Sequence, residues 1–158
     1  MKWTILIGLM CLSQLNLFSQ SKEMSDESDT KEIMIVREMI EAVNTQNAEM
    51  YVRDFSSDVS IIMDGKVRVN GKSALQSNRA DHFKRYPKMR SAIQHIVQIG
   101  NKVILHDQVW LTEKANKGSD IVEIFTFENG KIKMMEVIQA EDLLEEESKN
   151  ITTQDNDN

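Results

Sequence analysis

Cysteine and proline are almost absent from this chain of 158 residues, which contains one of each. The only cysteine, Cys11, lies in an N-terminal apolar stretch that we expect to be removed, so the mature chain would have no disulfide and no thiol chemistry. A domain of this size can bury a sufficient core without disulfides. The only proline, Pro87, disfavours helical backbone at the preceding Tyr86 and therefore ends a helical pattern.

Several functional sequence motifs are also missing. There is no P-loop, no dinucleotide fingerprint, no Ser-His-Asp motif and no tight metal-ligand spacing. The formal net charge is −6, and no basic stripe is interleaved with aromatic residues. The basic residues between 84 and 90 are interpreted as a solvated helix end. We therefore expect no cofactor, no metal and no nucleic-acid partner.

The two ends differ in composition from the middle. Residues 1–19 begin with the basic Lys2 and continue as an uncharged apolar run, which is typical of a secretory signal peptide. The run is too short to span a bilayer comfortably, although a retained anchor is the alternative. We expect cleavage near Ser19, no stable membrane anchor afterwards, and export to a bacterial periplasm or exterior. Residues 20–30 are predicted to be a flexible lead-in and 143–158 an acidic disordered tail, leaving 31–142 as a single domain.

Three helical patterns open this domain. Thr30 is suited to cap the first helix, whose apolar residues repeat at helical spacing through residue 43. Asn47 can cap a second, shorter helix that ends at residues 56–58. The third begins at residues 70–73, and one of its faces carries Leu75, Arg79, His82, Phe83 and Tyr86.

Alternating apolar residues predict strands in the rest of the domain. A short strand is expected at 59–63, and longer strands at 92–99 and 103–111. In the last of these, His106 and Asp107 point to opposite faces. Residues 119–140 form a hairpin, because Asn129-Gly130 tolerates the positive φ angles of a tight turn. Helices collected on one face of a curved, mainly antiparallel sheet make an α+β domain.

Glu123 is the strongest candidate for chemistry. The alternation of its strand places it on the same face as Ile121, Phe125 and Phe127. In an apolar pocket, desolvation raises the pKa of a carboxyl group and makes it a candidate general acid or base. The alternatives are an ion pair with a basic residue such as Arg37 or Arg79, or a position on the outer face.

Two histidines and one aspartate are further catalytic candidates. His82 and His106 can move a proton near neutral pH, although a histidine on an apolar face is more often a hydrogen-bonded core residue. Asp64 is also a candidate, but beside Gly65 it is first explained by a turn. Candidate ligand-binding residues supply aromatic, imidazole or thioether surfaces: Tyr51, Phe83, Tyr86, His95, Trp110, Phe125, Phe127 and Met135. Core packing explains many of them equally well.

The order of these elements and several short motifs resemble one fold family. The motifs are residues 42–44, 55–59, 70–75 and 125–132, together with 95–97 and 100–106. They are similar to those of the SnoaL-like and ketosteroid-isomerase-like superfamily, which includes nuclear transport factor two. The resemblance implies a cone-shaped α+β fold in which three N-terminal helices pack on a curved sheet and enclose an apolar pocket.

The resemblance also implies where a reaction would occur. Glu123 matches the protonated acid of the isomerase site, Asp64 lies one position from its base, and Met39 stands where the isomerase has a tyrosine. Our first hypothesis is an exported protein that binds a small apolar or polycyclic molecule and catalyses isomerisation, dehydration or cyclisation by proton transfer. The alternative is a non-catalytic ligand-binding or dimerisation module, and a homodimer is expected in either case.

Overall fold

The computed structural model describes residues 29–115 and 117–139. The predicted signal peptide, most of the lead-in and the predicted acidic tail lie outside these ranges. The elements are α1 (Lys31–Asn44), α2 (Ala48–Val52), β1 (Phe55–Met63), β2 (Lys66–Asn70), α3 (Lys72–Arg85), β3 (Arg90–Ile99), β4 (Lys102–Trp110), β5 (Ser119–Glu128) and β6 (Lys131–Gln139). Among the described residues, no helix has the length and apolar character needed to cross a bilayer.

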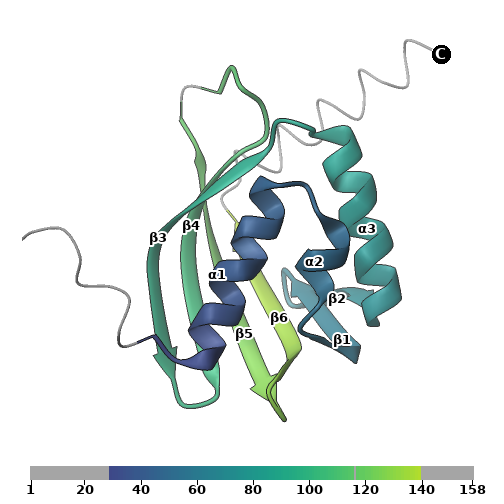
Figure 1. Cartoon of the computed structure of the whole chain (residues 1–158), viewed down its shortest axis with the longest axis vertical. Coiled ribbons are helices and arrows are strands. Elements are labelled where there is room, and N and C mark those ends of the chain that lie inside the picture. Colours follow the sequence, from purple (N-terminus) through teal and green to yellow (C-terminus); the bar gives the residue numbers. More distant parts are fainter. Residues whose placement is uncertain (1–28, 116, 140–158) are drawn as a thin grey trace, which may run out of the picture.

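The strands form one six-stranded sheet in the order β2-β1-β6-β5-β4-β3. β1 and β6 pair in parallel, and all other neighbours are antiparallel. The sheet curves around the helices, which all lie on its inner side (Figure 1). The expected α+β fold with three helices on a curved, mainly antiparallel sheet is therefore confirmed.

Local sequence explains where the first two helices begin. The Thr30 hydroxyl accepts a hydrogen bond from the backbone N–H of Ile33 at 3.3 Å, and the Asn47 side chain accepts one from Met50 at 2.9 Å. Both are N-caps of the predicted type, because they satisfy amide groups that have no partner within the helix. The apolar stripe of α1 is buried and packs against β3 and β4.

The core lies between the helices and the inner face of the sheet. Its fully buried side chains include Phe55, Leu75, Leu105 and Phe125, which come from β1, α3, β4 and β5. The alternation predicted for residues 103–111 is confirmed, since every second side chain there is buried. The same alternation in β5 turns Glu123 toward the inner side.

Two boundaries differ from the sequence-based predictions. The second helix ends at Val52, and residues 56–58 belong to β1, which begins at Phe55. The pairing of β1 with β6 is irregular between Phe55 and Ser60, so polar residues extend the strand where no alternation is visible.

A β-bulge in β3 changes one predicted face. The register shifts between Ile93 and His95, so Ile93 pairs with the inward Asp107 while His95 pairs with the outward His106. Strict alternation over residues 92–99 would place Ile93 and His95 on one face, and the bulge places them on opposite faces. An inserted residue moves all later side chains to the opposite face, and Ile96 rather than Val97 then packs against the core.

Candidate functional site

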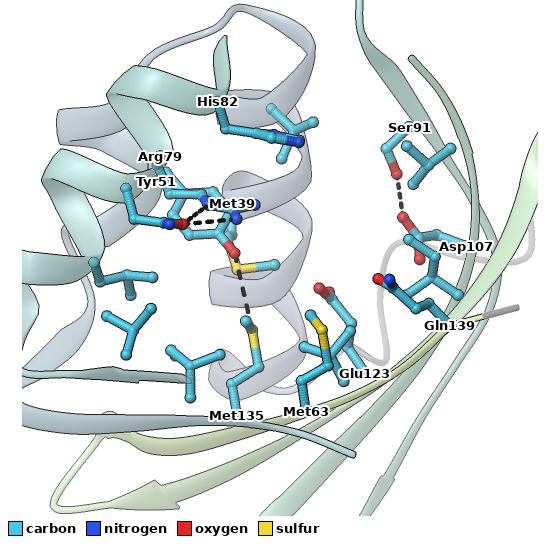
Figure 2. A pocket seen from close by; sticks show the side chains of 18 of the residues that line it. Met39, Tyr51, Met63, Arg79, His82, Ser91, Asp107, Glu123, Met135 and Gln139 are labelled. Atoms are coloured by element: carbon cyan, nitrogen blue, oxygen red, sulfur yellow. Dashed lines mark hydrogen bonds between the residues drawn. The ribbon is translucent and has the colours of Figure 1, made fainter. Parts of the chain in front are cut away.

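A pocket of about 470 Å³ lies between the helices and the inner face of the sheet. One part of its wall is soft and apolar, with the thioethers of Met39, Met63 and Met135 (Figure 2). Methionine adapts to irregular apolar surfaces. A pocket of this size and lining suits a small organic molecule.

Glu123 reaches this pocket from the middle of β5. Its Oε2 atom is buried and has no hydrogen-bond partner in the described part of the chain, although the residue as a whole is partly accessible. Burial, followed by the charge of the nearby Asp107, raises the pKa of the carboxyl group to about 8, although Arg79 opposes the shift. Glu123 is therefore mainly protonated at neutral pH and can donate a proton.

Asp107 is a second carboxyl group in the same pocket. It pairs across the strands with Ile121, two residues from Glu123, so the two acids are diagonal neighbours on the inner face. Burial raises the pKa of Asp107 to about 6, while a hydrogen bond from the Ser91 hydroxyl favours the ionised form. Its Oδ1 atom is buried without a hydrogen-bond partner among the described residues. At neutral pH Asp107 is therefore mainly ionised while Glu123 is mainly protonated.

Asn44, at the C-terminal end of α1, holds Ser91 within hydrogen-bond distance of Asp107. The Asn44 side chain accepts a hydrogen bond from the Ser91 N–H at 2.8 Å and donates one to the Ser91 carbonyl at 3.0 Å. This double contact holds the start of β3 against the helix. Figure 2 shows the Ser91 hydroxyl aimed at the Asp107 carboxylate. Asp107 thus has a fixed donor, and Glu123 has none in the described part of the chain.

The facing wall comes from α2 and α3. The Tyr51 hydroxyl donates to the Met135 sulfur at 3.9 Å, and burial followed by the charge of Glu123 raises the pKa of Tyr51. The Arg79 guanidinium lies 5.7 Å from the centre of the Tyr51 ring, and His82 lines the pocket one turn further along α3. The wall opposite the two acids is therefore aromatic and cationic (Figure 2).

Five of the candidate catalytic and ligand-binding residues predicted from the sequence line this pocket: Tyr51, Asp64, His82, Glu123 and Met135. Asp64 is peripheral among them. It is exposed in the turn between β1 and β2, has a φ of 53°, and accepts a hydrogen bond from Arg68 at 3.2 Å. The turn explanation therefore accounts for its position, and Asp107 stands nearer to Glu123 as a potential base.

Four aromatic candidates pack in the core and do not line the pocket: Phe83, Tyr86, Phe125 and Phe127. Phe83 packs edge-on against Tyr51 with ring centres 6.3 Å apart. These side chains support the pocket wall from behind. The prediction that these four side chains contact a ligand directly is not supported, because none of them lines the pocket.

His95, His106 and Trp110 lie on the opposite, outer face of the sheet. The Nδ1 atoms of the two histidines are 3.1 Å apart, and His106 Nε2 is 3.0 Å from Asp120. Trp110 stacks under Arg90, whose guanidinium lies 3.8 Å from the ring centre. Sequence patterns made His106 a catalytic candidate and His95 and Trp110 ligand-binding candidates, but all three lie on the other side of the sheet from Glu123. The β3 bulge turns His95 outward, and the alternation of β4 turns His106 and Trp110 outward.

Asp107, Ser91 and Asn44 take part in this site although the sequence patterns assign them no function. A signal for Asp107 was present, because a lone acid occupied the buried face of an otherwise apolar strand. Ser91 and Asn44 gave none, since their contact joins residues 47 positions apart. No group of three or more histidine, cysteine, aspartate or glutamate residues in the described ranges is arranged to hold a metal ion.

The model of the SnoaL-like domain matches residues 36–135 of this chain. The chain belongs to the SnoaL-like family. Solved structures support the same fold. A protein of Novosphingobium aromaticivorans described as an uncharacterized cystatin fold protein is 26% identical with a TM-score of 0.61, over 70% of this chain and 99% of that one.

Two more distant structures carry functional names. A putative polyketide cyclase from Sinorhizobium meliloti is 16% identical with a TM-score of 0.57, over 66% of this SnoaL-like chain and 94% of its own. TerC, co-crystallised with polyporic acid, is 17% identical with a TM-score of 0.63, over 74% and 97%. At these identities the likeness shows the fold alone. Comparison with curated protein sequences finds no match.

Proposed function

We propose that this SnoaL-like protein binds a small, largely apolar organic molecule and catalyses a proton transfer on it without a cofactor. The observation that carries the proposal is the buried Oε2 atom of Glu123, which lines the pocket without a hydrogen-bond partner in the described part of the chain. Leaving a buried polar atom unpaired costs about 1–3 kcal/mol. A ligand carbonyl that accepts a hydrogen bond from the protonated Glu123 would remove this cost.

The two carboxyl groups suit the two halves of such a transfer. Ionised Asp107 takes a proton from a carbon next to a ligand carbonyl, and protonated Glu123 gives its proton to the carbonyl oxygen, which yields an enol. If the ligand carries a β,γ double bond, the enol is a dienol. Asp107 then returns its proton to the γ-carbon while Glu123 takes back the proton of the enol hydroxyl, which completes an isomerisation. Paired acids whose surroundings push their pKa values apart are typical of this chemistry. His82, on the facing wall, is a second proton carrier within the same pocket.

Two fold relatives support the ligand class. One is named as a putative polyketide cyclase, and TerC was crystallised with polyporic acid. Both names involve compact organic molecules that a pocket of about 470 Å³ can hold. The expectation of export also remains a proposal, which rests on the composition of residues 1–19.

Carboxyl titration by NMR tests the acid assignment directly. With ¹³C-labelled protein, the Glu123 carboxyl should titrate near pH 8, and its signal should be missing in Glu123→Gln. Glu136→Gln is the matched control, because Glu136 lies on the outer side of the neighbouring strand β6. A Glu123 signal that titrates near its ordinary value of 4.5 would remove the basis of the proposal.

A pH profile then distinguishes catalysis from binding. Once a substrate is found, activity should rise with a pKa near 6 and fall with a pKa near 8, because the reaction needs Asp107 ionised and Glu123 protonated. Because the two carboxyl groups interact, both pKa values of the profile are properties of the Asp107–Glu123 pair and not of either residue alone. Glu123→Gln should remove the alkaline limb and lower turnover by about 10²-fold or more. A flat profile would favour the non-catalytic alternative.

That alternative is a ligand-binding module that also dimerises. The observation that favours it is the outer face of the sheet, where Val97 and Ile138 are half exposed. On this face Val97, Ile104 and Ile124 form one cross-strand row. Two copies of a sheet face can pack against each other, which removes apolar surface from water. The module and the enzyme share this fold and differ in whether the two acids act on the ligand.

A further inference from the structure

The six arginines of the described chain differ in their partners. Arg37, Arg53 and Arg68 each form an ion pair with a carboxylate at the surface. Arg79 and Arg85, both on α3, have no carboxylate within ion-pair distance in the described ranges, and both line the pocket. A guanidinium presents five N–H donors in a fork that matches a carboxylate. The sixth arginine, Arg90, also has no carboxylate partner in the described ranges, but it stacks on Trp110 at the outer face of the sheet. The pocket therefore holds two of the three arginines that lack an ion pair within the described part of the chain.

Arg79 is held in place by neutral partners. Its Nε and Nη2 atoms donate to the Asn78 side-chain oxygen at 3.3 and 2.9 Å, and its guanidinium lies 5.7 Å from the Tyr51 ring centre. These contacts orient the guanidinium but leave its positive charge uncompensated. Glu123 is near enough to feel that charge, yet Glu123 is mainly protonated at neutral pH.

The pocket therefore has two electrically different walls. The helix side carries positive charge from Arg79 and Arg85, and the sheet side carries the negative charge of Asp107. Apolar methionines lie between them. An anionic group on a ligand would be attracted to α3 and repelled by Asp107, so it can occupy the pocket in only one orientation.

We propose that Arg79, assisted by Arg85 at the exposed edge of the pocket, binds an anionic oxygen group, so that the ligand is an organic acid with an apolar body. This inference deepens the proposed function and rests on it for the use of the same pocket. With the acid group on α3, the apolar body lies along the methionines. The opposite end then reaches Glu123 and Asp107, where the proton transfer takes place.

Two fluorescent probes that share an apolar body test this inference on the intact protein. Anilinonaphthalenesulfonate carries an anionic group, and phenylnaphthylamine is its neutral counterpart. Arg79→Gln should lower the binding affinity for the anionic probe by about tenfold or more, which is the usual effect of losing a hydrogen bond to a charged group. The neutral probe should change by less than about twofold, because it makes no such bond. Arg85→Gln should show a smaller loss of the same kind.

Arg90→Gln is the matched control. Arg90 is exposed and stacks on Trp110 at the outer face, so the same substitution there should change neither probe. Equal losses for both probes in Arg79→Gln, an unchanged anionic probe, or the same loss in Arg90→Gln would overturn the inference. Circular dichroism melts confirm that each variant is folded.

The outcome is separable from that of the proposed function. Probe binding reports the charge of α3 and does not require Glu123 to titrate near pH 8. Selective loss in Arg79→Gln together with an ordinary Glu123 pKa would keep the acid-binding site and reject proton transfer. A Glu123 pKa near 8 without a selective loss in Arg79→Gln would keep proton transfer and reject the acidic ligand.

Discussion

Glu123 and Asp107 show how two acids on one sheet face acquire different charge states. They are diagonal neighbours, and burial raises the pKa of both. Ser91 supplies a hydroxyl donor to Asp107, which favours the ionised form, while the buried Oε2 of Glu123 has no partner in the described chain. A single hydroxyl group on β3 therefore helps to separate an acid from a base.

Glu123 should make stability depend on pH. Its folded-state pKa of about 8 lies above the ordinary 4.5, so between these values the folded chain holds a proton that the unfolded chain has released. The free energy of unfolding therefore falls as the pH rises through this window. Glutamine at position 123 does not titrate, so the variant should not lose this stability. The free energy of unfolding of Glu123→Gln, minus that of wild type, should therefore be larger at pH 8 than at pH 4.5 by at least about 1.4 kcal/mol, the energy of one pKa unit.

Urea denaturation at several pH values measures this difference. Glu136→Gln is again the control and should run parallel to wild type, because its carboxylate lies on the outer side of the sheet. If Glu123→Gln also runs parallel to wild type, Glu123 is ionised in the folded state and the assignment of a buried acid is wrong.

Sequence alone gave a correct position for Glu123 and an incomplete account of its partners. Strand alternation is local, so it placed Glu123 on the same face as Phe125 and Phe127, and Asp107 on the face opposite His106. The supporting contacts are not local, because Ser91 depends on Asn44, and Arg79 approaches from a helix. Local patterns determine which way a side chain points, but they do not say which distant residue meets it.

At the scale of elements, the clearest discrepancy is the bulge in β3. The residues 92–99 alternate in the sequence, yet the pairing with β4 shifts between Ile93 and His95. Neither glycine nor proline marks the position. The bulge moves His95 next to His106 on the outer face, which leaves His82 as the histidine of the pocket. Bulges arise from pairing, so one strand read alone does not predict them.

The cap of α2 should contribute measurably to stability. Asn47 accepts a hydrogen bond from the Met50 N–H at 2.9 Å, and α2 has only five residues. Asn47→Ala should lower the free energy of unfolding by about 1 kcal/mol, whereas Asn47→Asp should retain most of it because aspartate is an equally good cap. Thermal and urea denaturation measure both. Equal losses in the two variants would indicate that the amide nitrogen, and not the cap oxygen, matters.

The loop before β5 depends on a close approach to Trp110. A Cβ atom added at Gly118 would lie 2.7 Å from Trp110 Cε2, so the indole ring or the loop must move. Gly118→Ala should destabilise the protein by about 1–3 kcal/mol, as overpacking does. The same substitution in a Trp110→Leu background should cost clearly less, because the ring is gone. A cost that is unchanged in that background would assign the effect to backbone conformation instead.

For the whole molecule, the sequence predicted the order of elements and the side of the sheet that the helices cover. It did not predict that β1 joins the sheet in parallel beside β6. That pairing brings together strands some 75 residues apart, as the contact between Asp58 and Lys133 shows. It places Met63 and Met135 in the same pocket. The pocket is therefore a property of the assembled sheet and of no single segment.

The outer face of this sheet should be the surface through which two copies associate. Two cross-strand rows meet there, Val97-Ile104-Ile124 and His106-Val122-Ile138, and Val97 and Ile138 are 49% and 56% exposed. Two identical faces with the same strand spacing can pack on each other around a two-fold axis. The chain should therefore be a dimer by size-exclusion chromatography with light scattering.

Ile138→Lys should convert this dimer to a monomer, since a buried, unpaired lysine is costly. Val67→Lys is the matched control, because Val67 is similarly exposed, at 59%, but lies on the edge strand β2. Binding of the pocket probes should survive in the Ile138→Lys monomer, because the pocket opens on the other side of the sheet. A wild-type chain that is monomeric at all concentrations would reject this interface, and loss of probe binding on dissociation would instead make the second copy part of the site.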